Sequence, residues 1–241
     1  MKSITSYIPN TITCLNLLSG SMAVIMALNP EMSVWGLAAQ TWAFIFIGAA
    51  TVFDFWDGFS ARLLKAYSPM GKELDSLSDL VSFGLAPSML VLSLMLSCAA
   101  SKWVALFALL IVVCGALRLA KFNVDTRQTT SFVGLPIPAN AIFWIGALSW
   151  INVHGYPGDV VMCVLIAALS LLMVSEIKMF SLKFQTWGVR ENVRRYVIML
   201  AAVLFVITDG VAGLAWTIVL YVLISLLGKR TDPDAPQDGE K

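Results

Sequence analysis

The chain has 241 residues, of which 59% are hydrophobic and 13% charged, with a mean hydropathy of +0.82 and a formal net charge of +1. This composition excludes an ordinary soluble domain, and the near-neutral charge gives no reason to expect a nucleic-acid partner. Because apolar runs long enough to cross a bilayer recur along the chain, the sequence predicts an all-α, polytopic transmembrane helical bundle. We expect a single transmembrane domain over residues 1–228 and a cytoplasmic tail, 229–241, that is too acidic and proline-bearing to fold.

Eight apolar segments follow one another with short connections. At roughly 20 apolar residues per crossing, the predicted spans lie at about residues 12–29, 37–64, 72–98, 101–122, 137–152, 156–174, 194–208 and 212–227. The last two are short and are joined by Thr208, Asp209 and Gly210, which suits a tight hairpin. They could instead form one bent element that does not cross. Ahead of the first span, residues 3–9 alternate polar and apolar side chains, as expected of a short helix at the membrane surface.

Basic residues fall almost entirely on one side of this arrangement. If all eight segments cross, fifteen of the sixteen Lys and Arg residues share a side with both termini, and only Lys102 lies opposite. Because cytoplasmic loops carry the excess of Lys and Arg, both termini are predicted to be cytoplasmic. We therefore expect a multi-pass protein of the cytoplasmic membrane.

Four aspartates interrupt the second and third predicted spans: Asp54, Asp57, Asp75 and Asp79. An ionised carboxylate within a span is unfavourable by about 2.5–3.5 kcal/mol, so this group requires compensating positive charge. Helical spacing places two sets of residues on one face each. The first set is Asp54, Asp57, Gly58, Ala61 and Arg62, and the second is Gly71, Asp75, Asp79 and Phe83. Because a short connection makes the two helices antiparallel neighbours, the four carboxylates are predicted to converge near the cytoplasmic end.

Carboxylate oxygens without histidine or thiol partners favour a hard divalent cation, Mg or Mn. Two ions would balance the four charges and leave coordination positions for anionic oxygens, such as those of a pyrophosphate. Arg62 would add a phosphate contact, and the small Gly58 and Ala61 would let a ligand approach the backbone. Two other interpretations remain open at this point: a solvated loop with salt bridges, and a pathway for protons or cations.

Residues 54–62 and 71–79 together resemble the signature of the CDP-alcohol phosphatidyltransferase family, D-x-x-D-G-x-x-A-R followed after eight residues by G-x-x-x-D-x-x-x-D. All eight defining positions match. Four further runs are similar to the bacterial, membrane-embedded members that make phosphatidylserine. They are IPNTITCLNLLSG from residue 8, DSLSDLVSFGLAP from residue 75, RLAKFNV at 118–124 and FVGLPIPANA at 132–141. One departure is Lys121, where Arg is expected; it keeps the charge but loses the bidentate geometry.

The resemblance implies a transmembrane enzyme that transfers a phosphatidyl group from CDP-diacylglycerol to the hydroxyl of L-serine and releases CMP. It implies Asp54, Asp57 and Asp75 as metal ligands, with Asp79 either completing the site of a second ion or accepting the hydroxyl proton. Contacts to CDP-diacylglycerol are implied for Gly58, Ala61, Arg62 and Gly71, with Ser68, Asn10 and Thr13 as weaker candidates. A homodimer in contact with membrane lipids is also implied.

Serine is a zwitterion whose carboxylate requires a cation, and the resemblance assigns serine binding to Arg118, Lys121 and Asn123 at the end of the fourth span. From the residues alone, Arg118 and Lys121 would instead be anchors whose charged ends reach the membrane surface. The loop GLPIP either shapes the acceptor site or caps the fifth span. Two alternatives remain: a membrane ion or proton transporter, and a sibling enzyme using glycerol phosphate or inositol phosphate. Those dianionic acceptors would require a denser basic pocket.

Overall fold

The computed structural model describes residues 7–124, 132–179 and 189–227. The tail predicted over residues 229–241 lies outside the described residues, as does most of the surface helix expected at 3–9. The sequence therefore remains the only basis for both predictions.

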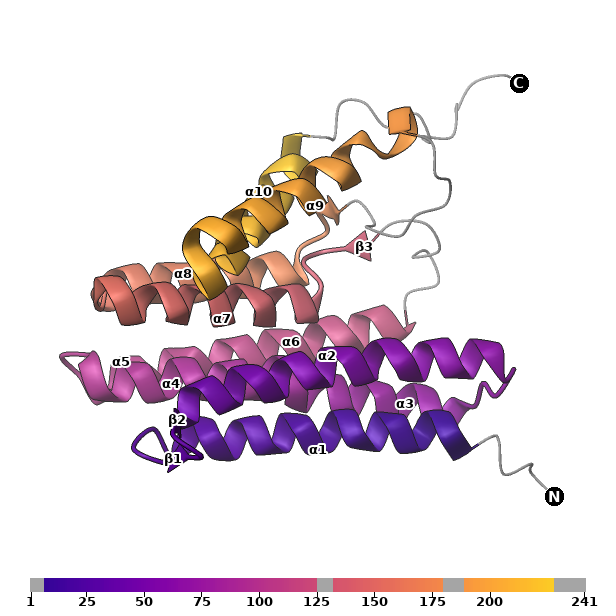
Figure 1. Ribbon diagram of the computed structural model, residues 1–241, viewed down its shortest axis with the longest axis horizontal. Helices are drawn as coiled ribbons and strands as arrows, with labels where there is room; N and C mark the ends of the chain where they lie inside the picture. Colours follow the sequence, from indigo (N-terminus) through magenta and orange to yellow (C-terminus); the bar gives the residue numbers. More distant parts are fainter. Residues whose placement is uncertain (1–6, 125–131, 180–188, 228–241) are drawn as a thin grey trace.

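The described chain is almost entirely helical, and its helices run side by side (Figure 1). The long helices are α1 (Ile8–Leu28), α2 (Ala39–Leu63), α3 (Pro69–Asp79), α4 (Ala86–Cys98), α6 (Leu109–Val124), α7 (Ile137–His154), α8 (Asp159–Val174), α9 (Val189–Asp209) and α10 (Gly213–Leu227). Shorter elements are the π-helix η2 (Leu80–Leu85), α5 (Lys102–Ala105), and the 3-10 turns η3 (Leu106–Ala108) and η4 (Gly210–Ala212). Two short antiparallel ladders pair β1 (Ser33–Val34) with β2 (Leu37–Ala38), and β3 (Phe132–Val133) with β4 (Lys178–Met179).

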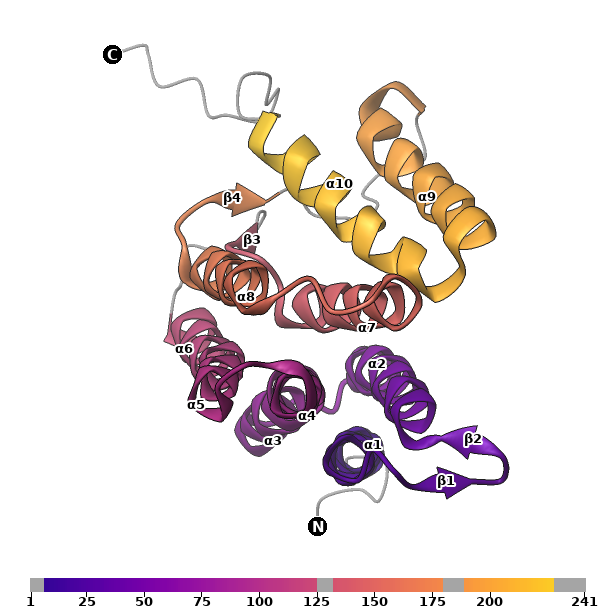
Figure 2. The ribbon, with the colours of Figure 1, turned by 90° about the vertical axis from the view of Figure 1, so that its left-hand side faces the viewer.

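The helices form three layers, seen end-on in Figure 2. Helices α1 to α6 make the first layer, α7 and α8 the second, and the hairpin of α9 and α10 the third, where α10 packs against α7. Gly146 of α7 makes this contact possible, because a Cβ there would collide with the backbone of Ala215 in α10. The hairpin expected at Thr208–Gly210 is confirmed.

Five helical segments among the described residues are long and apolar enough to cross a membrane. They are Ile8–Leu28, Ala39–Leu63, Pro69–Cys98, Lys102–Val124 and Asn192–Leu227, the last of which contains the hairpin, while Asp159–Val174 is a shorter apolar helix. The prediction of a polytopic helical membrane protein is confirmed at this level. The number of crossings and the orientation of the termini remain predictions.

Helices α1 and α2 pack through small side chains along the half of their interface that lies away from the start of α1. Buried residues there include Gly20, Ala23 and Ala27 of α1 and Ala39 and Ala43 of α2. Small residues let two helix backbones approach closely, which is how helices associate when lipid removes the hydrophobic driving force. Nearer the amino terminus of α1 the same interface becomes polar, and this polar half contains the site described next.

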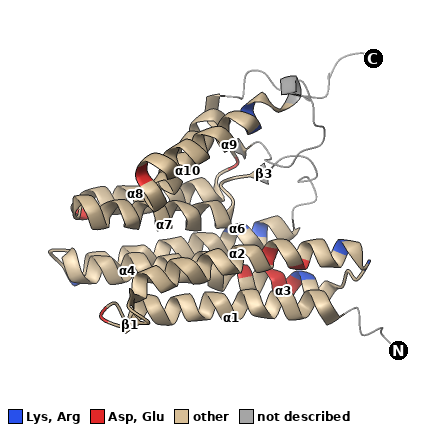
Figure 3. Cartoon of the chain, viewed as in Figure 1, with Lys and Arg blue, Asp and Glu red and all other residues tan. Residues whose placement is uncertain are grey.

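The charges follow the same division (Figure 3). Most Lys and Arg residues among the described part of the chain lie toward the end of the bundle where α1 begins, and acidic residues gather on neighbouring parts of α2 and α3. Short basic connections at one end and an apolar middle are what a positive-inside arrangement requires.

Candidate metal centre and donor pocket

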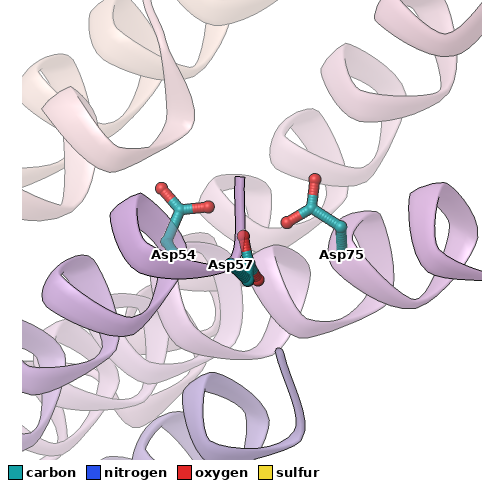
Figure 4. A group of neighbouring side chains, drawn as sticks. All are labelled: Asp54, Asp57 and Asp75. Atoms are coloured by element: carbon teal, nitrogen blue, oxygen red, sulfur yellow. The ribbon is translucent and has the colours of Figure 1, made fainter. Parts of the chain in front are cut away.

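Three of the four predicted aspartates converge. Asp54 and Asp57 come from α2 and Asp75 from α3, and each offers a carboxylate oxygen such that the three atoms lie within 4.8 Å of one another. Figure 4 shows the carboxylates of Asp54 and Asp75 on either side of Asp57, turned into a common space. The i, i+3 spacing on α2 and the short connection to α3 produce this arrangement, as the sequence predicted.

Local hydrogen bonds fix the geometry of both helices at this point. The Thr13 hydroxyl donates to Asp57 Oδ2 at 2.7 Å, which ties α1 to α2, and the Ser60 hydroxyl donates to the Asp57 carbonyl oxygen at 2.9 Å. Helix α3 begins at Pro69, and the hydroxyl of the preceding Ser68 caps it by accepting from the Gly71 amide at 2.9 Å. The N-cap therefore sets where α3 starts and where Asp75 lies.

The three carboxylates fit a divalent cation. Two ionised carboxylates about 4.8 Å apart repel by roughly 3 kcal/mol at an effective dielectric constant near 20. Asp75 Oδ1 is buried and has no hydrogen-bond partner among the described residues, so it presents an unused acceptor to the cluster. The donor set consists of oxygen atoms alone, which suits Mg or Mn better than a soft metal. Identity and number of ions remain open.

Asp79 lies beside this group rather than within it. Its carboxylate contacts that of Asp54 and accepts a hydrogen bond at 3.3 Å from the side-chain amide of Asn16. Helix α3 ends at Asp79, and the chain continues as the π-helix η2. Phe83, predicted to share the face of Asp75 and Asp79, lies within η2 and is fully buried.

A cavity of about 510 Å³ opens beside the carboxylates. Asp57 and Asp75 form part of its lining, and Gly58 leaves open space on its α2 side because no atom lies within 4 Å of where a Cβ would be. The other predicted donor contacts that line it are Asn10, Thr13, Ala61, Ser68 and Gly71. The first turn of α3 borders the same cavity, and the amino end of a helix favours anions.

Arg62 is the predicted donor contact that the structure does not bring to this cavity. Its side chain is exposed, and its Nε atom donates to the Gly58 carbonyl oxygen at 2.9 Å. Tyr67 and Lys72 line the cavity instead, although neither was predicted to. The connecting loop between α2 and α3 contributes Tyr67, and motif spacing gives no information about a loop side chain.

Arg118 is buried on α6, 8% exposed, and lies within electrostatic reach of Asp79 and of Tyr221 on α10. Its Nε atom has no hydrogen-bond partner among the described residues, and its guanidinium lies 5.8 Å from the ring centre of Phe122. A buried guanidinium with an unused donor is poorly compensated by the protein alone. The guanidinium of Arg118 is therefore buried inside the bundle, unlike a charge that reaches the membrane surface.

The other two residues assigned to serine have protein partners. Lys121 forms an ion pair with Glu176 at 3.2 Å, near the end of α8. The Asn123 side chain donates to the Ser76 hydroxyl at 2.9 Å, and the Asn123 backbone carbonyl oxygen accepts from Lys72 Nζ at 3.1 Å. These contacts join α6 to α3 and to the segment after α8, whereas Arg118 interacts with the charge of Asp79.

Comparison with known proteins agrees with this site. The family model of CDP-alcohol phosphatidyltransferases matches residues 6–174, which contain every aspartate of the cluster. A Bacillus subtilis (strain 168) protein named CDP-diacylglycerol–serine O-phosphatidyltransferase is 38% identical over 173 residues, covering 72% of this chain and 89% of that protein. A protein of the same name from Mycobacterium leprae (strain TN) is 34% identical over 227 residues, 90% of this chain and 72% of that one. An archaetidylserine synthase from Methanothermobacter thermautotrophicus is 34% identical over 182 residues, covering 73% and 72%.

Proposed function

The chain belongs to the CDP-alcohol phosphatidyltransferase family, and we propose that it transfers the phosphatidyl group of CDP-diacylglycerol to the hydroxyl of L-serine, giving phosphatidylserine and CMP. The observation that carries this proposal is the junction of the aspartate cluster with the cavity of about 510 Å³. The relatives named for serine favour this acceptor over glycerol phosphate or inositol phosphate.

The cavity supports binding of the donor's CDP part. Gly58, Ala61 and Gly71 keep its walls free of bulky side chains, and Asn10 and Thr13 supply polar groups from α1. The amino end of α3 would face the diphosphate, whose negative charge the backbone amides and the helix dipole stabilise. Arg62 keeps a role in this proposal only if its exposed side chain turns from Gly58 toward the bound nucleotide.

Asp54, Asp57 and Asp75 would hold the cation, Mg or Mn, and two such ions would balance the negative charge of all four carboxylates. A bound divalent cation supplies charge neutralisation of the diphosphate and stabilises CMP as the leaving group. The protein's own contribution would be to position the three carboxylates before the donor binds, through the hydrogen bond from Thr13 to Asp57 and the Ser68 cap of α3.

Asp79 is the residue we assign to the hydroxyl proton. The serine oxygen bonds to the phosphorus that carries diacylglycerol, the bond from this phosphorus to the CMP oxygen breaks, and the hydroxyl proton passes to the Asp79 carboxylate. Its position at the edge of the cluster, next to Asp54 and facing Arg118, supports this assignment. Arg118 would bind the serine carboxylate, because one guanidinium matches one carboxylate in a bidentate pair. Lys121 and Asn123 would support this pocket indirectly, through α3 and Glu176.

Varying serine and CDP-diacylglycerol separately tests both the function and the acceptor pocket. For the wild-type protein we expect CMP release that saturates with each substrate. Arg118→Ala should raise the KM for serine by at least about tenfold, while the KM for CDP-diacylglycerol stays within about twofold, because only the acceptor presents a free carboxylate. Lys102→Ala, which removes an exposed charge at the opposite end, is the matched control. Unchanged serine dependence in Arg118→Ala would exclude Arg118 from the acceptor site.

We also propose that the site faces the cytosol, in a multi-pass protein of the cytoplasmic membrane. With the four native cysteines replaced, Met70→Cys should react with an impermeant thiol reagent only from the cytoplasmic side, because basic loops are retained there. Trp35→Cys, 88% exposed between β1 and β2, should react only from outside. The reverse pattern would invert the orientation and separate the site from cytosolic serine. The family resemblance extends the proposal to a homodimer, which cross-linking of the purified protein tests.

A further inference from the structure

Asn16 is a polar side chain in the middle of α1 that is fully buried, at 0% exposure. A primary amide carries two donors and an acceptor, and each is unfavourable in a membrane-embedded interior unless it is paired. Asn16 belongs to neither half of the family signature and does not line the donor cavity. Its partners therefore indicate what it does.

Two of these partners define which way the amide points. The Ser82 hydroxyl lies 2.7 Å from the side-chain oxygen Oδ1 of Asn16 and 3.0 Å from the Asn16 backbone carbonyl oxygen, and these two oxygens are acceptors. Because Oδ1 accepts from Ser82, the amide nitrogen must lie on the other side, where it donates to Asp79 Oδ1 at 3.3 Å. A flipped amide would place the Asn16 side-chain oxygen against the Asp79 carboxylate, where two acceptors would face each other, so the contact with Asp79 fixes this orientation.

The backbone is shaped to allow this contact. Ser82 lies in the π-helix η2, three residues after Asp79, and is itself 0% exposed. It approaches α1 at Gly20, where a Cβ would collide with the Cα and hydroxyl of Ser82. A glycine on α1 and a π-helix opposite it thus bring the Ser82 hydroxyl within reach of Asn16. π-Helical turns often accompany functional sites.

We propose that Asn16 and Ser82 form a positioning pair that holds the Asp79 carboxylate in the orientation required to accept the serine proton. The proposal rests on the function proposed above for Asp79. Asn16 Nδ2 donates to Oδ1 of Asp79 and so restrains rotation of this carboxylate about its Cβ–Cγ bond. Neither residue touches a reacting atom, so each acts only through Asp79.

Ser88 provides a matched comparison. It also is 0% exposed, lies two turns further along the same helical segment, and donates to the Ala108 carbonyl oxygen at 2.9 Å. Its hydrogen bond is structural and has no connection to Asp79. Ser82→Ala and Ser88→Ala remove the same atom from equally buried positions, so a difference between them in turnover reports on Asn16 and Asp79 rather than on stability.

The experiment measures kcat, both KM values and the melting temperature for Ser82→Ala, Asn16→Ala, the double variant and Ser88→Ala. We expect Ser82→Ala to lower kcat by about tenfold and Asn16→Ala by up to about a hundredfold, with the KM for CDP-diacylglycerol within about twofold. The double variant should match Asn16→Ala alone, because Ser82 acts through Asn16. Ser88→Ala should keep the wild-type kcat.

Three results would overturn the pair. A wild-type kcat in Ser82→Ala would remove Ser82 from it, and multiplicative losses in the double variant would show that the two residues act independently. If Ser82→Ala and Asn16→Ala are both unfolded at the assay temperature while Ser88→Ala is folded, the role is structural. Absence of serine-dependent CMP release by the wild-type protein would overturn the proposed function and this inference together, which separates that failure from the other three.

Discussion

Replacing any one of Asp54, Asp57 or Asp75 by Asn should lower kcat by at least about a hundredfold, because each substitution removes an anionic ligand from a cation that carries charge in the transition state. Asn keeps the shape of the side chain, and at position 57 its side-chain oxygen can still accept the hydrogen bond from Thr13. The loss should therefore appear in turnover rather than in folding. Serine-dependent CMP release by the purified variants measures it.

Asp159→Asn is the matched control for these substitutions. Asp159 lies at the opposite end of the bundle, where its carboxylate accepts from the Ala100 amide at 3.1 Å and from the Tyr156 hydroxyl at 2.8 Å. This variant should lose stability but retain turnover once folded. Near-normal turnover in any of the three cluster variants would contradict the metal assignment.

Asp79→Asn should lower kcat by about 10²- to 10⁴-fold, because an amide cannot accept the serine proton. Its KM for CDP-diacylglycerol should stay within about twofold of the wild type, since the cavity proposed for the donor is lined by α1, α2, the loop after α2 and the start of α3. Steady-state kinetics with each substrate varied in turn separate the two effects.

The concentration of Mn or Mg that gives half-maximal activity distinguishes the two roles weighed for Asp79. An unchanged value with low kcat is the outcome expected of a proton acceptor. A large increase in the required cation concentration, with kcat restored at saturation, would instead make Asp79 a ligand of the second ion and leave the proton without an acceptor.

The fold class and the aspartate cluster could be predicted from the sequence because each depends on short-range regularities. Apolar runs of bilayer length predict helices in lipid. The spacing of Asp54 and Asp57 determines a shared helical face, and the short connection to α3 brings Asp75 opposite them. A carboxylate within an apolar span is also energetically unfavourable, which marks it as a candidate site residue.

Asn16 is a residue that the same energetic argument identifies from the sequence as requiring a partner. A buried amide in an apolar span is unfavourable without a partner, as a carboxylate is, and it lies one turn after Thr13 on α1. Ser82 could not have been found in this way, because its position depends on a π-helix that an α-helical period does not anticipate.

The sequence was least informative about the contacts that individual side chains make. The face predicted for Arg62 did not show that its guanidinium folds back to Gly58, and the basic character of Lys121 did not show its pairing with Glu176. Tyr221 lies beyond the residues matched by the family model, on a hairpin whose contact with α7 depends on Gly146 and Ala215. Such contacts depend on how segments remote in sequence pack together. Helical periodicity predicts only which residues share a face of one helix.

The most direct test of the central claim is CMP release from CDP-diacylglycerol by the purified wild-type protein, with serine, glycerol phosphate and inositol phosphate offered in turn, first with Mg or Mn and then with EDTA. We expect CMP and phosphatidylserine to form only when serine and a divalent cation are both present, and activity to return when excess cation is added after EDTA. Transfer to glycerol phosphate with serine ignored would contradict the acceptor assignment, and turnover that persists in EDTA would contradict the metal centre.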